Sequence, residues 1–165
     1  MYVPIENMPA HSRVWIYQAG NELSEQEEIT IAASLNVFCD QWAAHGSGLK
    51  TSFRIDHHRF VLLAVDQKAG DASGCSIDSS VRALKELEQK LGIDFFDRSE
   101  IAFWENGQVV THPLSKLKKL FAICRLSPES ETFNTLATTL GEWDNHPRMA
   151  VAESWLKRYL PEVSV

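Results

Sequence analysis

The sequence predicts an α+β fold, a ferredoxin-like two-layer sandwich with an added hairpin strand and a C-terminal helical extension. Two observations predict it. Segments with strand-like and helix-like apolar patterns follow one another in the order β-α-β-β-α-β. An Asn-Gly pair then marks a hairpin whose second strand extends the sheet. Packed in two layers, this order is typical of the ferredoxin-like sandwich.

The first strand and the first helix have clear signals. Residues 13–18 are rich in β-forming side chains and predict the strand. Ser24 and Glu27 have the spacing of a capping box, in which each side chain bonds an unpaired backbone N–H of the other residue. The helix that follows is expected to end at Gly46. Its apolar stripe consists of Ile31, Leu35, Phe38 and Trp42.

Two strands and a second helix come next. Residues 51–55 alternate between polar and apolar side chains, whereas residues 60–65 are continuously apolar and are expected to be buried on both faces. A tight connection over residues 56–59 joins them. The second helix is expected from Ser76 to Leu91, with Gly92 as its left-handed cap.

The last part of the chain predicts a hairpin and then helices. Residues 101–104 and 108–111 flank the Asn-Gly turn. Beyond Thr111, helices are expected from Pro113 onward, over residues 133–143 and over residues 150–160, although four threonines weaken the second of these. Without a long linker, we expect one domain. It comprises an α/β sandwich core over residues 1–111 and a helical extension packed on it over residues 112–165.

Composition excludes several classes of function. The 165 residues include 16 Lys and Arg against 22 Asp and Glu, which gives a net charge of −6. An acidic chain without clustered cations is a poor binder of nucleic acid. The longest uncharged stretch, residues 29–39, is much shorter than the ~20 residues of a membrane span. Three cysteines without paired spacing, and no basic leader before an apolar run, indicate a cytoplasmic protein.

One loop, residues 71–80, has the features of a reactive site. It follows a buried strand and opens a helix, where backbone N–H groups and the helix dipole favour an anion. A thiol in that position is stabilised as the thiolate, so Cys75 is the candidate nucleophile and His45 the preferred base. The candidate ligand-binding residues around it are Ser73, Gly74, Ser76 and Asp78.

The same loop has a simpler interpretation, in which a serine caps the helix, Gly74 permits the turn and Cys75 is a small, partly buried residue. A phosphate-binding role lacks the residues it requires. No lysine follows Gly74 as in a Walker A loop, and Arg82 lies one position too far from Cys75 for a cysteine-phosphatase loop. We predict no cofactor and no metal site, because His57 and His58 are adjacent and point to opposite faces of a strand.

Several strings of the sequence are distinctive. They are Trp42-Ala-Ala-His45-Gly46 and residues 60–66, 72–81, 91–98, 132–134 and 154–158. In these strings the chain resembles a family of short, uncharacterised bacterial proteins, often labelled ABC transporter ATPases. The label does not fit, because residues 60–66 only look like a Walker B strand and the Walker A loop is absent. The resemblance therefore implies no established activity and supplies no catalytic residues.

These observations favour a small cytoplasmic binding or interaction domain without established catalysis, whose partner is an unidentified protein or small molecule. The hairpin over residues 101–111 would supply an exposed sheet edge for a homodimer. No nucleic acid and no membrane are expected as partners. The alternative function is a thiol-dependent enzyme that uses Cys75. A nucleotide hydrolase ranks last, because the lysine that would hold the phosphates is missing.

Overall fold

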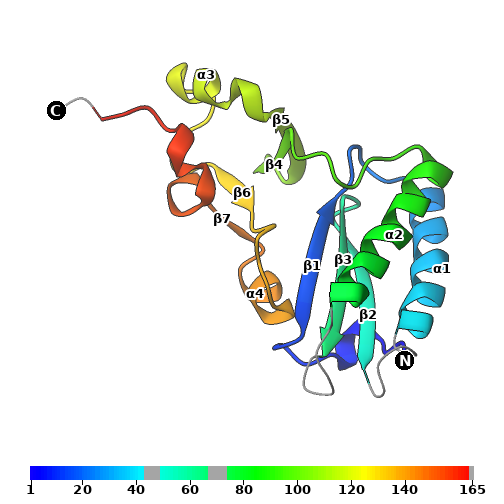
Figure 1. The fold of residues 1–165 in the computed structure, drawn as a ribbon. Coiled ribbons are helices and arrows are strands. Elements are labelled where there is room, and N and C mark those ends of the chain that lie inside the picture. Colours follow the sequence, from blue (N-terminus) through cyan, green and yellow to red (C-terminus); the bar gives the residue numbers. More distant parts are fainter. Residues whose placement is uncertain (43–48, 67–73, 164–165) are drawn as a thin grey trace. The chain divides into compact units, whose positions relative to one another are not determined.

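The computed structural model describes residues 1–42, 49–66 and 74–163, which form two compact units (Figure 1). Unit 1 consists of Met1–Phe96 and Thr135–Asn145, and unit 2 of Asp97–Asn134 and His146–Val165. Each unit has its own antiparallel sheet and its own hydrophobic core. The predicted α+β class is confirmed.

The sheet of unit 1 contains β1 (Arg13–Gln18), β2 (Lys50–Asp56) and β3 (Phe60–Asp66) in the order β1-β3-β2. The helices α1 (Glu25–Trp42) and α2 (Gly74–Leu91) lie side by side on one face of it (Figure 1). The central strand β3 pairs with both neighbours and is buried at every position. Its continuous apolar run has the double burial that the sequence predicts.

The predicted helix caps are present. The Ser24 backbone N–H donates to Glu27 Oε2 at 2.8 Å, and the Glu27 N–H donates to Ser24 Oγ at 3.2 Å, which completes the capping box of α1. Gly92 ends α2 with φ +67°, and its N–H donates to the Glu88 carbonyl at 2.8 Å. The predicted stop of α1 at Gly46 lies outside the described residues.

The second face of the unit 1 sheet is covered by two short elements far apart in the sequence. They are the N-terminal 3₁₀ turn η1 (Ile5–Asn7) and the helix α4 (Leu140–Asn145). The fully buried ring of Phe60 on β3 meets the ring of Trp143 on α4, with centroids 5.4 Å apart. The second cover of β3 therefore comes partly from the N-terminus and partly from the segment of unit 1 that follows residue 134.

Unit 2 is built on the sheet β5-β4-β6-β7. Its strands are β4 (Glu100–Glu105), β5 (Gln108–Pro113), β6 (Glu131–Phe133) and β7 (Arg148–Ala150). In the two-residue turn between β4 and β5, both residues have positive φ (51° and 78°), which the predicted Asn-Gly pair adopts at little cost.

Short helical segments cover the Phe103 face of the unit 2 sheet. They are the 3₁₀ turns η4 (Leu114–Lys116), η5 (Val151–Glu153) and η6 (Trp155–Tyr159) and the helix α3 (Leu117–Ala122). The core residues are Phe103, Leu117, Phe121, Leu126, Val151 and Leu156. None of the helices in the described residues is long and apolar enough to cross a membrane.

The expected five-stranded ferredoxin-like sheet is wrong in one respect. The predicted sheet contains the fourth strand beside the first three, but β4 pairs with β5 and β6 in unit 2. The outer edge of β1 is instead bonded by residues just before α4. The Val14 N–H donates to the Thr138 carbonyl at 3.0 Å, and a single antiparallel bridge joins Arg13 to Thr139.

The predicted C-terminal helices are also corrected. In place of a helix over residues 133–143, β6 ends at Phe133 and α4 begins only at Leu140, where the Glu142 N–H donates to Thr139 Oγ1 at 3.2 Å and caps the helix. In place of a helix over residues 150–160, the chain forms the end of β7 and two 3₁₀ turns. The region after residue 111 thus supplies strands as well as helices.

One carboxylate joins α4 to β2 within unit 1. Asp56, at the end of β2, accepts a hydrogen bond from Trp143 Nε1 at 2.7 Å and forms an ion pair with Arg54 Nε at 2.8 Å. The side chain of Asp56 is 19% exposed, whereas that of Asp144, which pairs with the same arginine, is 44% exposed. Asp144 is therefore a suitable control for Asp56, because both pair with Arg54 and differ in burial.

We expect Asp56→Ala to lower the free energy of unfolding by about 2–3 kcal/mol, because the indole N–H of the buried Trp143 side chain loses its hydrogen bond to the Asp56 carboxylate. Asp144→Ala should cost less than about 1 kcal/mol, as is usual for an exposed ion pair. Urea denaturation of both variants measures the difference. Equal losses would show that Asp56 does not hold α4.

Candidate functional site

The predicted thiol site lies at the start of α2. The helix begins one residue before Cys75, so Cys75 and Ser76 belong to its first turn, close to the predicted start. Asp78 is exposed and follows that turn, which has no acidic residue. Ser73 and His45 lie outside the described residues, as do the side chains of Cys75 and Ser76. A pairing of Cys75 with His45 therefore stays a prediction.

The two other cysteines provide a reference for thiol reactivity. Cys39, on α1, is buried, and this burial raises the pKa of its thiol to about 12. Cys124, at the end of α3, is exposed. Both are free thiols. A buried thiol with a high pKa is a poor nucleophile, so Cys39 has a packing role.

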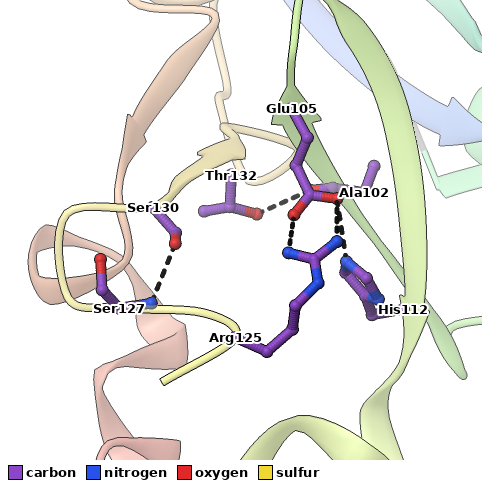
Figure 2. Close-up of polar contacts among 7 residues, drawn as sticks. All are labelled: Ala102, Glu105, His112, Arg125, Ser127, Ser130 and Thr132. Carbon is purple, nitrogen blue, oxygen red and sulfur yellow. Dashed lines mark hydrogen bonds and ion pairs between the residues drawn. The ribbon is translucent and has the colours of Figure 1, made fainter. Parts of the chain in front are cut away.

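A polar cluster joins the β4–β5 hairpin of unit 2 to the segment after α3 (Figure 2). At its centre, the Glu105 carboxylate accepts hydrogen bonds from both Arg125 Nη atoms, at 2.7 and 3.4 Å. Its Oε2 also lies 3.1 Å from His112 Nε2. The side chains of Glu105 and His112 are about 15% exposed (15% and 14%), whereas that of Arg125 is 51% exposed.

The electrostatics of this cluster follow from its hydrogen bonds. The bond from Arg125 holds the pKa of Glu105 below the ordinary carboxyl value of 4.5, and the bond from His112 acts in the same direction. Burial opposes both by raising the pKa, but does not outweigh them. The carboxylate in turn raises the pKa of Arg125. Glu105 is therefore ionised at neutral pH.

Two further contacts hold the segment that carries Arg125 (Figure 2). The Ser127 N–H donates to Ser130 Oγ at 3.0 Å, which closes the turn before β6. Thr132 Oγ1 donates to the Ala102 carbonyl of β4 at 2.9 Å. These bonds place the guanidinium beside Glu105 without a regular helix or strand around it.

We call Glu105, His112 and Arg125 the clamp, because their contacts hold the hairpin to the segment after α3. Arg125 and His112 both bond the Glu105 carboxylate. Among the described residues, no serine, threonine or cysteine side chain is hydrogen-bonded to His112. In the described part of the chain, no three His, Cys, Asp or Glu side chains are placed to share a metal ion. We interpret the cluster as structural.

A pocket of about 580 Å³ lies at the other end of the hairpin, between the start of β4 and the end of β5. Its lining residues are Ser99, Pro113, Leu114, Ser115, Lys118 and Tyr159. They come from β5, η4, α3 and η6 and from the residue before β4, all within unit 2. The Leu114 N–H donates to the Ser99 carbonyl at 2.7 Å and joins two of the walls.

The polar groups of the pocket suit an anion. Lys118 is exposed and forms no ion pair with any described residue. No carboxylate lines the pocket. The hydroxyls of Ser115 and Tyr159 add donors, whereas that of Ser99 already bonds Asp97 and lowers the pKa of that carboxyl. The guanidinium of Arg158 lies 5.8 Å from the Tyr159 ring, but Arg158 is not one of the lining residues.

The charge of the chain is divided unequally between the units. Unit 1 has eight Lys and Arg against fifteen Asp and Glu, a net charge of −7. Unit 2 has eight against seven, a net charge of +1. The overall acidity that the sequence shows thus belongs to unit 1. An anion meets less repulsion at unit 2.

Comparison with known proteins gives no relative: no protein-family model, curated protein or solved structure matches the chain.

Sequence reasoning missed both features of unit 2. Glu105, His112 and Arg125 are separated by seven and thirteen residues, and no local motif connects them. The pocket combines residues 99 and 159, whose approach depends on the sheet and on η6. Lys116, Lys118 and Lys119 are evident in the sequence, but nothing in the sequence around them indicates a pocket beside Lys118.

We expect Glu105→Gln to destabilise the protein at pH 7, because the carboxylate partner of Arg125 is lost. Since the pKa of Glu105 is lower in the folded chain, its contribution is complete above pH 4.5 and is lost as the pH falls through the folded-state pKa. The difference from the parent should therefore shrink between pH 7 and about pH 3 in urea denaturation.

The control for that experiment is Glu131→Gln, which removes the 49% exposed partner of Arg148 in the same unit. An exposed pair of this kind contributes little. A pH-independent loss in Glu105→Gln would contradict the assignment of the clamp to the ionised carboxylate.

Alkylation with iodoacetamide tests the thiols. We expect Cys124 to react in the folded protein and Cys39 to react only after unfolding, because its thiol is buried and has a pKa of about 12. We expect Cys75 to react no faster than Cys124. Peptide mass spectrometry over a range of pH measures all three rates. Faster reaction of Cys75, with an apparent pKa below ~8.5, would support the thiol-enzyme alternative instead.

Proposed function

We propose that the protein is a small binding protein, and that its ligand is an organic carboxylate with an apolar body, held in the pocket of unit 2. The observation that carries the proposal is the pocket itself, in which a lysine that has no ion partner among the described residues lies beside apolar side chains. Pockets of ~300–1,000 Å³ are typical of small-molecule sites. The volume of about 580 Å³ lies within this range.

The lining supports a carboxylate more than a phosphate. Lys118 supplies a single positive charge, which balances one carboxylate, and the hydroxyls of Ser115 and Tyr159 supply neutral donors. A phosphate dianion would call for a second cation or an arginine fork, and the pocket lining has neither. Pro113, Leu114 and the Tyr159 ring provide apolar surface for the rest of the ligand.

Other observations support a binding role in the cytoplasm. Unit 1 keeps the β-α-β-β-α order, with β3 in the centre, that is common to ferredoxin-like sandwiches, and these often bind ligands or partners; this support is analogy of fold. Cys39 and Cys124 are free, as expected in a reducing compartment. The distinctive strings of the sequence support membership of the family of short bacterial proteins that the chain resembles.

Thiol-dependent catalysis is the second candidate. It is favoured by one observation, the start of α2 at Gly74, which places Cys75 in the first turn of an 18-residue helix. Nucleotide hydrolysis has no such support, because the sequence lacks a Walker A loop.

We expect benzoate, a carboxylate on an apolar ring, to bind with a Kd on the order of 1 mM, as suits a shallow site with one charged contact. Benzyl alcohol lacks the charge and inorganic phosphate lacks the apolar body, so both should bind more weakly. Lys118→Met should weaken benzoate binding roughly fivefold or more. Calorimetric titration measures each affinity.

The matched control is Lys119→Met, one residue along α3 and outside the pocket lining. Its affinity for benzoate should equal that of the parent. The proposal fails if benzoate shows no saturable binding, or if the two lysine variants lose affinity equally.

A further inference from the structure

The strand β5 forms an open edge of the unit 2 sheet. It is six residues long, Gln108–Pro113, and lies at the end of the order β5-β4-β6-β7. At the opposite end, β7 has only three residues. The longer strand therefore offers far more backbone for pairing with another strand.

The register of the hairpin identifies which backbone groups of β5 point outward. Glu105 and Gln108 flank the two-residue turn and exchange hydrogen bonds, so residues 108, 110 and 112 direct their N–H and C=O groups toward β4. Val109 and Thr111 direct theirs away from the sheet. In the described chain, neither residue has a hydrogen bond from these outward groups.

This edge lacks the charged residues, prolines and bulges that usually prevent an edge strand from pairing with another strand. Residues 108–112 include no Lys, Arg, Asp or Glu and no proline, and the register with β4 runs without a bulge. Pro113 interrupts the edge only at its last residue, where the chain leaves the sheet for η4. The uncharged edge spans the length between the hairpin turn and that proline.

We propose that β5 pairs with β5 of a second copy of this chain, antiparallel and centred on Val110. In this register Val109 of each copy lies opposite Thr111 of the other, and the outward groups of both residues form four backbone hydrogen bonds across the two-fold axis. The two Val110 side chains face each other, in the closely spaced type of pair. The two four-stranded sheets become one sheet of eight strands.

Three properties of β5 favour a second copy over an unrelated segment. The strand is uncharged, so two copies pair without like-charge repulsion. In this register every residue from 108 to 112 lies opposite a residue of the same range in the partner strand. Pairing ends on both sides where Pro113 lies opposite the partner's Gly107 in the hairpin turn. Gln108 falls opposite the partner's His112, a polar pair at each end of the valine contact.

Light scattering on size-exclusion chromatography tests the association. We expect a mass of twice 18.6 kDa for the parent at high concentration, with dissociation on dilution. Thr111→Pro removes an outward N–H and no bond to β4, so it should give a folded monomer. Thr111→Ala keeps the N–H and should remain a dimer. If Thr111→Pro does not fold by circular dichroism, Val109→Pro removes the equivalent donor.

Cross-linking tests the register. In a background of Cys75→Ser and Cys124→Ser, which leaves only the buried Cys39, Val110→Cys should form a disulfide-linked dimer on mild oxidation, because the two residues face each other. Val109→Cys should not, since each Cys would lie two positions away from its copy. A parent that is monomeric at every concentration, or proline variants that still dimerise, would overturn the proposal. Equal cross-linking at positions 109 and 110 would overturn the register.

Discussion

The burial of β3 on both faces is the constraint on which the rest of unit 1 depends. A strand composed of seven buried residues must be covered twice. The helices α1 and α2 supply one layer from the sequence next to the sheet. The other layer needs α4, which follows the β4–β6 part of unit 2 in the sequence. The bond between Asp56 and Trp143 fixes that returning segment where it is needed.

In unit 2, two polar features lie at opposite ends of the β4–β5 hairpin. Near the turn, the Glu105 carboxylate is bonded by Arg125 and His112. In the pocket at the other end of the hairpin, Lys118 has no acidic partner among the described residues. The carboxylate of Glu105 is thus bonded within the fold, whereas the exposed ammonium group of Lys118 stays open to a ligand of the proposed kind.

Local signals predicted the elements of residues 13–113 well, because capping, turn chemistry and apolar periodicity act over a few residues. Ser24, Gly92 and Asn106 are examples whose predicted roles are present. Which sheet a strand joins is decided by distant partners, and nothing near β4 indicates that Thr138 will occupy the edge of β1. The pocket depends on the same long-range placement. The predicted Cys75 site stays undecided, because only its helix start lies within the described residues.

The division of unit 1 into two sequence segments has a consequence for synthesis on the ribosome. When residue 96 has been made, β3 is complete, but the cover that includes Phe60's neighbour Trp143 is still 47 residues from being translated. During that interval one face of the nascent sheet lacks α4 and presents apolar surface to the cell. Unit 1 can reach its final state only after most of unit 2 has been translated, so the order of translation and the order of completion of the two units differ.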